Sequence, residues 1–362
     1  ALPDNPLTWS GELYGDLDRI RASELLKNLG LKGPLYSGIG STRFWASFEQ
    51  GRVTSITADL ALADVRAQLA PKLAELRLPR LTGRLHYADD GSQTRFSAKD
   101  FTFTTINDAR FGPSDIEAQC DHDASGTVIG CSFKASELSL SNIAKIGTSL
   151  PLPAAALKLL KDRPFSGTLR QLNASFNGDY ADLGAWTFSS FFTGLSLPPA
   201  NDGMPGVRNI SGEISTSNPG EFVVDLDTHY ATLYFPGIFR HPQMNFSSIT
   251  GRVSAALHST PKFTFTDITA VSDDGTVRGS GTWESTGGAG TINISGTAEG
   301  VNGAAVHKYL PIVVGDPALD YVEAAVLAGR VSNGRWEVRG KLDDFPWDGA
   351  APQEGHFLIE GD

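Results

Sequence analysis

The chain is poor in the residues that would direct it to a metal, a membrane span or a nucleic acid. It has 2 cysteines and 2 methionines among 362 residues. It contains no run of about 18 apolar residues, so no segment of it would cross a bilayer as a helix. The net charge is -11, and the 30 lysines and arginines are spread along the chain. Nucleic-acid binding needs a clustered basic face, so we expect no such partner.

Motifs for catalysis and metal binding are also missing. The histidines form neither His-x-His nor His-Glu-x-x-His, and the sequence has no Gly-x-Ser-x-Gly elbow, P-loop or Gly-x-Gly-x-x-Gly. The segment Asp121–Gly126 resembles half of a calcium loop, but Ser132 stands where a bidentate glutamate is needed. An acidic hairpin tip explains it better, because Asp, Ser and Gly favour turns. We expect no enzymatic activity, no cofactor and no metal site.

The two cysteines lie symmetrically about Ser125-Gly126. If these two residues form a turn, Cys120 and Cys131 lie opposite each other in a hairpin, about 4.5–5.5 Å apart at Cα. A disulfide can bridge that distance. Two free buried thiols and metal ligation are the alternatives, although two cysteines alone cannot complete a zinc site. We predict the disulfide, which implies an oxidising compartment.

The length of the chain exceeds the roughly 250–300 residues that one simple core supports, so we expect two domains or an elongated core. The composition suggests a mixed strand and helix segment over 1–162, a repetitive antiparallel segment over 163–300, and a helical pair with closing strands over 301–362. There is no signal peptide and no starting methionine. We expect an internal segment whose targeting and anchoring parts lie elsewhere.

Alternation of apolar and polar residues is the dominant pattern, and it is typical of strands with one apolar and one wet face. A second pattern, apolar-x-Gly-x-apolar, recurs along the chain, for example at Trp9–Leu13, Leu81–Leu85, Phe165–Leu169, Ile249–Val253 and Val338–Leu342. Glycine at matching places lets a sheet bend. These patterns predict a mainly β fold with minor α: a long, curved, twisted antiparallel sheet that forms an apolar groove.

Helical periodicity interrupts the strands, and we interpret these segments as lids or end-pieces of the sheet. Apolar stripes on such helices mark core contacts far more often than ligand sites. Proline cannot donate a hydrogen bond inside a helix, so Pro311 should kink or end the helix that contains it. The predicted helices are 18–29, which ends at Gly30, 63–76, 141–149, 154–161, 303–314 and 317–328.

The C-terminal half resembles the YhdP family of AsmA-like proteins. The resemblance depends on a Tyr309-Leu-Pro segment, a second helix ending in Ala328-Gly, a strand glycine at Gly334, Phe345-Pro-Trp347 and Gly355-His-Phe357, in that order. An earlier stretch from Pro205 to Val253 is similar to the same family's repeat. Together these stretches cover roughly residues 164–362, and the first 160 residues match only in style.

The resemblance implies a periplasmic segment of a protein anchored in the inner membrane by an N-terminal helix that is absent here. Such proteins carry phospholipid along an apolar groove toward the outer membrane. The expected partners are phospholipid acyl chains, and membrane contact would be made by parts outside this segment. A structural or adhesive β-solenoid, whose apolar face is a sealed core, is the alternative.

Alternation assigns one set of side chains to the lipid-facing surface. A register slip of one residue would instead turn charges such as Asp225 and Arg252 inward. This would cost on the order of several kcal/mol of stability for each unpaired charge. The predicted groove residues are Phe165, Leu169, Trp186, Phe188, Phe222, Val224, Leu226, Ile249, Val253, Phe263, Phe265, Trp283, Ile292, Ile294, Trp336 and Val338.

Overall fold

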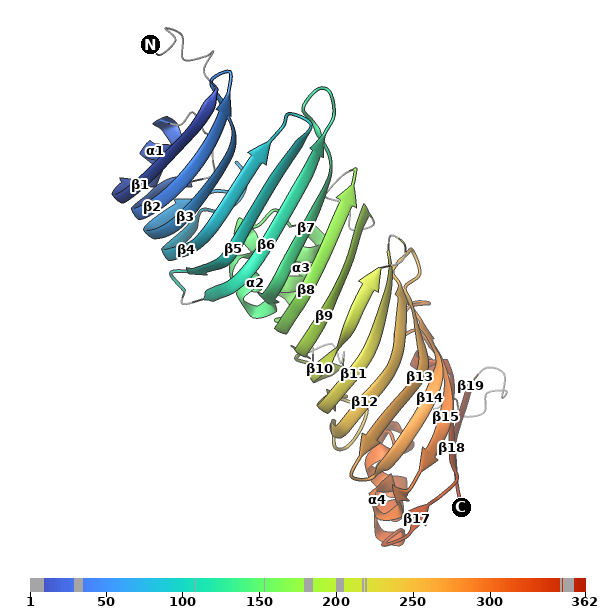
Figure 1. The fold of residues 1–362 in the computed structure, drawn as a ribbon. Helices are drawn as coiled ribbons and strands as arrows, with labels where there is room; N and C mark the ends of the chain where they lie inside the picture. Colours follow the sequence, from blue (N-terminus) through green and yellow to red (C-terminus); the bar gives the residue numbers. More distant parts are fainter. Residues whose placement is uncertain are drawn as a thin grey trace, which may run out of the picture. The chain divides into compact units, whose positions relative to one another are not determined.

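The computed structural model is mainly β, as the alternation predicts, and its strands form an antiparallel sheet of 17 strands (Figure 1). It describes residues 10–28, 35–107, 109–152, 154–178, 185–199, 205–216, 218, 220–345, 347 and 355–362. The chain divides into two compact units, Ala1–Pro164 with Thr168–Ser190, and Phe165–Gly167 with Phe191–Asp362. The proposed division at 162 and 300 remains a prediction.

In the first unit, each strand from β1 to β8 pairs antiparallel with the next along the chain. This is the topology that short turns between alternating strands favour. The strands are β1 Gly11–Arg21, β2 Leu35–Glu49, β3 Arg52–Ala67, β4 Leu76–Asp89, β5 Gln93–Thr104, β6 Arg110–His122, β7 Val128–Ser139 and β8 Ser166–Asn177. The next strand, β9 Trp186–Leu197, belongs to the first unit up to Ser190 and to the second from Phe191.

The second unit continues the same topology, with consecutive pairing from β10 to β15 and then β15 with β18 and β18 with β19. A separate two-stranded ladder joins β16 and β17. The strands are β10 Gly206–Thr216, β11 Glu221–Tyr234, β12 Gln243–Ala256, β13 Lys262–Ser272, β14 Gly275–Glu284, β15 Thr291–Glu299, β16 Val301–Asn302, β17 Arg330–Val331, β18 Gly334–Lys341 and β19 Gly355–Glu360.

The core of the first unit lies where short helices cover one face of its sheet. Figure 1 shows the helices α1 Ala22–Asn28, α2 Leu140–Ile146 and α3 Ala154–Asp162 on the same side of these strands. Ala22 of α1 and Ile146 of α2 pack into one buried cluster with side chains of β3, β4 and β5: Leu62, Val65, Leu78, Leu81 and Phe103. Burial of these apolar groups stabilises the covered end of the sheet.

The predicted helix over 63–76 is wrong. Residues up to Ala67 belong to β3, and β4 begins at Leu76. Asp64 has a left-handed backbone, with φ 52°. This turns Leu62 and Val65, three residues apart, toward the same buried cluster. A spacing of three is also a helical spacing, so the irregular strand imitates a helix in the sequence.

The other predicted helices are partly correct. The strand β1 runs to Arg21, so the first helix begins at Ala22 and not at residue 18. Its predicted end at Leu29–Gly30, like Trp9 of the first glycine motif, lies outside the described residues. The prediction for 303–314 is corrected to two 3₁₀ helices, Gly303–Tyr309 and Ile312–Val314, with Pro311 between them. The helix α4 spans Asp316–Ala325.

The two units share a local arrangement that the glycine motif marks. In each, an aspartate on one strand accepts two hydrogen bonds from the arginine after the motif glycine on the next strand. Asp59 and Arg84 are joined by bonds of 2.6 and 2.9 Å, and Asp225 and Arg252 by bonds of 2.7 and 3.1 Å. The sequence separations are 25 and 27 residues, so the same local arrangement occurs once in each unit.

Candidate lipid-binding face

The register of the second unit places its predicted groove residues on one face. Residues that lie directly opposite each other in paired strands project to the same side of a sheet. One row across the strands consists of Phe222, Ala255, Phe263, Trp283 and Ile292. A second row consists of Val224, Val253, Phe265, Gly281, Ile294 and Val338. Leu226, Ile249 and Trp336 lie on the same side by alternation and pairing.

The opposite face of these strands carries the charges. Asp225 lies opposite Arg252 in the register, and their side chains form an exposed ion pair. Asp227, Glu337 and Arg339 occupy the same side by alternation. Exposed ion pairs of this kind contribute about 0–1 kcal/mol each. Their main effect is on register, because a slip of one residue would exchange them with the apolar rows.

The apolar rows are only half-covered. Ile249 is buried, at 5% exposure. Each of the other predicted groove residues is intermediate in exposure, neither buried nor fully exposed. A sealed core buries its large side chains almost completely, as the cluster around Leu62 and Val65 does at 3% and 1% exposure. Apart from Ile249, the predicted groove residues of the second unit are therefore less completely covered than that cluster.

The four remaining predicted groove residues lie in β8, in β9 or directly before β8. Leu169 lies opposite Leu138 of β7. Trp186 packs against Phe176, with ring centroids 4.8 Å apart. Phe188 follows Trp186 at the spacing of one face of β9. Phe165 precedes β8 and is half-buried. The structure thus brings Leu169 and Trp186 next to apolar neighbours within the first unit.

Several residues of the face were missed by sequence reasoning. Ile214 lies opposite Val224, and Phe357 lies opposite Val338. Ile214 ends an apolar-x-Gly-x-apolar motif, so its register could have been extended from the neighbouring strand. Ile268 lies opposite Gly279 although it is three residues after Phe265. The left-handed Asp267, with φ 50°, shifts the alternation there, and no simple pattern reveals it.

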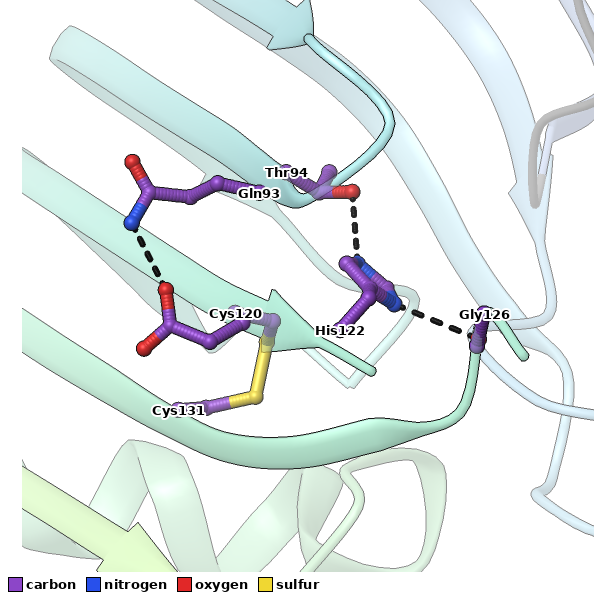
Figure 2. Close-up of a disulfide and its surroundings, with 7 residues drawn as sticks. Gln93, Thr94, Cys120, His122, Gly126 and Cys131 are labelled. Atoms are coloured by element: carbon purple, nitrogen blue, oxygen red, sulfur yellow. Dashed lines mark hydrogen bonds between the residues drawn. A yellow bond between two sulfur atoms is a disulfide. The ribbon is translucent and has the colours of Figure 1, made fainter. Parts of the chain in front are cut away.

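The apolar side of the first unit carries the disulfide (Figure 2). Cys120 of β6 lies directly opposite Cys131 of β7, and the two are joined. Beside them, the His122 ring bonds to Thr94 Oγ1 at 2.9 Å, and Gln93 donates to Asp121 at 2.6 Å. The disulfide therefore fixes the register of the β6–β7 hairpin close to its turn.

The turn of this hairpin differs from the predicted Ser125-Gly126 pair. It spans Asp123–Thr127, because the Asp123 amide donates to the Thr127 carbonyl and the Gly126 amide to the Asp123 carbonyl. A register shift beside His122 restores the symmetric position of the cysteines. The Asp123 carboxylate accepts bonds from Ser125 and Thr127, and the Ser125 hydroxyl is the main cause of its lowered pKa. The segment that resembles half of a calcium loop is thus a turn whose own residues donate hydrogen bonds to the Asp123 carboxylate.

Within the described ranges, no group of three or more His, Cys, Asp or Glu side chains is placed to hold a metal ion. In the same ranges, no helix combines the length and apolar character needed to cross a bilayer.

The fold and the face together define a class of protein: a β-sheet scaffold with a half-buried apolar face and charged residues on the opposite face. Comparison with family models agrees with this class. The chain belongs to the YhdP family, whose model, described as YhdP protein, matches residues 4–362. Membership connects the chain with a lipid-transport-related role at the level of the family. No curated protein and no solved structure gave a significant match.

Proposed function

We propose that the chain is a periplasmic segment of a bridge-like phospholipid transport protein that carries acyl chains along its apolar face between the inner and outer membranes. The main support for the proposal is that the large apolar side chains of that face are only half-buried. Large apolar side chains rarely stay uncovered over many adjacent strands unless something binds them. Phospholipid acyl chains are flexible and apolar, so they fit a surface that offers rows of side chains and no deep pocket.

The energetics favour such an occupant. Each CH₂ group that leaves water for an apolar surface gains about 0.8 kcal/mol. The first row alone crosses four strand spacings of about 4.8 Å, or roughly 19 Å. That distance accommodates most of an extended acyl chain. The interaction is non-directional, so a lipid would slide along the face without breaking specific bonds, as transport requires.

The alternative of a structural or adhesive solenoid requires the same face to be a sealed core. The exposure of Val224, Val253 and Phe265 argues against it, because these residues are half-exposed while the first unit's cluster is buried. The disulfide supports the periplasmic location, since disulfides persist in oxidising compartments. An inner-membrane anchor and membrane contacts outside this segment belong to the same proposal.

A matched pair of adjacent residues tests the proposal. Val224 and Val223 are both half-buried in β11, but Val224 lies opposite Val253 and Val223 opposite Ser254. They therefore project to opposite faces of the same strand. A photo-crosslinking amino acid at position 224 should form phospholipid adducts in the cell, and the same probe at 223 should not. Adducts detected by mass spectrometry equally at both positions, or at neither, would contradict the proposal.

A further inference from the structure

A polar cavity of about 220 Å³ lies within the second unit, beside the apolar strands. The start of β12, the turn after β13 and the end of the 3₁₀ helix Gly303–Tyr309 form its walls. His241, Asn245, Asp273, Lys308 and Tyr309 contribute polar groups to it. Met244 also lines it and lies opposite Leu233 in the register, so the cavity adjoins apolar side chains.

Asp274 organises the inner wall of this cavity. Its carboxylate accepts a hydrogen bond from the Tyr309 hydroxyl at 3.0 Å and an ion-pair contact from Lys308 Nζ at 3.1 Å. Burial raises the pKa of Tyr309 to about 12, so the hydroxyl stays protonated and donates at neutral pH. The Asp274 side chain is 20% exposed and the Lys308 side chain 45% exposed. Lys308 is therefore positioned by Asp274 and still accessible from the cavity.

A capped helix of the first unit carries an apolar residue at the same distance from its cap. Ser139 caps α2 with its side chain, and Asn302 caps the 3₁₀ helix in the same way. Seven residues after each cap stand Ile146 and Tyr309. Ile146 packs into the buried cluster at 6% exposure, whereas Tyr309 turns a hydroxyl to Asp274. A partly buried polar group needs a hydrogen-bond partner to offset the loss of water, and Asp274 gives Tyr309 that partner. The second unit therefore offers polar side chains at this wall, which Ile146 and its apolar neighbours do not offer in the first.

The charges of the cavity indicate the chemistry of that ligand. Asp273 is exposed at the rim, and among the described contacts its carboxylate has no hydrogen bond or ion pair. Among its acidic and lysine side chains, the two carboxylates of Asp273 and Asp274 and the one ammonium of Lys308 leave one excess negative charge. A wholly anionic group would be repelled, while a group with an ammonium next to a phosphodiester would find partners of both signs.

We propose that this cavity takes the zwitterionic head group of an ethanolamine phospholipid, with its ammonium at Asp273 and its phosphodiester at Lys308. This inference rests on the proposed function, because it assigns the head group and the acyl chains of one lipid to the same unit, where β12 and β13 contribute to both the cavity and the apolar rows. The cavity then gives the conduit a head-group preference that an apolar surface alone cannot supply.

Calorimetric titration of the full chain with short-chain phosphatidylethanolamine and phosphatidylglycerol, both below their micelle concentrations, tests the inference. The unmodified chain should bind the ethanolamine lipid about tenfold more tightly, as one charge-assisted contact allows. Asp273→Asn should remove this preference, because it weakens binding of the ethanolamine ammonium and relieves the repulsion of phosphatidylglycerol. Asp227→Asn, an exposed carboxylate on the charged face, is the matched control and should keep the preference.

The other outcomes separate the two proposals. Equal binding of both lipids by the unmodified chain, or a preference that survives Asp273→Asn, overturns the head-group site and leaves the conduit standing. Binding of neither lipid overturns both. Free phosphoethanolamine serves as a third ligand: an affinity equal to that of the lipid would assign the cavity to a soluble metabolite and overturn the lipid assignment.

Discussion

At the scale of single residues, the strands depend on a few left-handed positions whose amides are satisfied by the next strand. Asp100 and Asp267 have φ of 51° and 50°. The Asp100 amide donates to the Asp115 carboxylate at 3.0 Å, and the Asp267 amide donates to the Ser280 hydroxyl at 2.9 Å. Such backbone costs about 1–3 kcal/mol, which these bonds help to offset. Each left-handed residue shifts the alternation by one position, so the apolar side chains before and after it lie on the same face of the strand.

The disulfide gives a prediction at this scale. Cys120→Ser with Cys131→Ser should lower the free energy of unfolding by about 2–3 kcal/mol, because the bond closes a short loop in the unfolded chain. The cysteines are 11 residues apart. Urea unfolding of the full chain, followed by tryptophan fluorescence, measures the change. Reduction of the unmodified chain should give the same shift. Two free thiols in natively exported, denatured protein would contradict the prediction.

At the scale of elements, the motif glycines allow neighbouring strands to approach closely. Gly251 of β12 has φ 129°, and a Cβ there would lie 2.7 Å from Ile268 Cα and 2.8 Å from the Asp267 carbonyl oxygen. Both neighbours are backbone atoms of the left-handed step in β13, so neither can move alone. The glycine and the step therefore depend on each other at this crossing of β12 and β13.

Gly251→Ala should therefore destabilise the chain by about 2–4 kcal/mol, from strained φ and a backbone clash together. Gly126→Ala is the matched control: Gly126 also has positive φ, 82°, but a Cβ there meets nothing within 4 Å. It should lose about 1–2 kcal/mol from backbone strain alone. Denaturant unfolding compares the two variants. Equal losses would show that the close approach of β12 and β13 contributes nothing.

At the scale of the whole molecule, the proposed open apolar face predicts that folding and ligand binding are separable. Leu226→Asp places a charge on the half-buried apolar face of β11, where water can still solvate it. We expect native circular dichroism and a cooperative transition for this variant. We also expect phospholipid to co-purify with the unmodified chain and not with the variant. Val223→Asp on the other face should keep its lipid. If Leu226→Asp unfolds the chain instead, the face is a sealed core, because a buried unpaired charge strongly destabilises a fold.

The sequence by itself determined the fold class, the antiparallel strand order and the separation of Asp225 and Arg252 from Val224 and Val253. These follow from the period of two along a strand, which is a local property. It also paired Cys120 with Cys131, although it misjudged the turn between them. Local periodicity could not distinguish the left-handed step at Asp64 from a helix, because both place apolar side chains three residues apart.

Only the tertiary structure decided which apolar residues are covered. Alternation is the same for Leu62 and Val253, yet Leu62 is buried in a cluster with Ala22 of α1 and Ile146 of α2, whereas Val253 is half-buried. It also decided that Tyr309, Asp274 and Lys308 meet, although Asp274 lies more than 30 residues from the other two. The exposure of a side chain and the contacts between residues far apart in the sequence both depend on how the strands and helices pack. The spacing of residues along the chain carries no information about that packing.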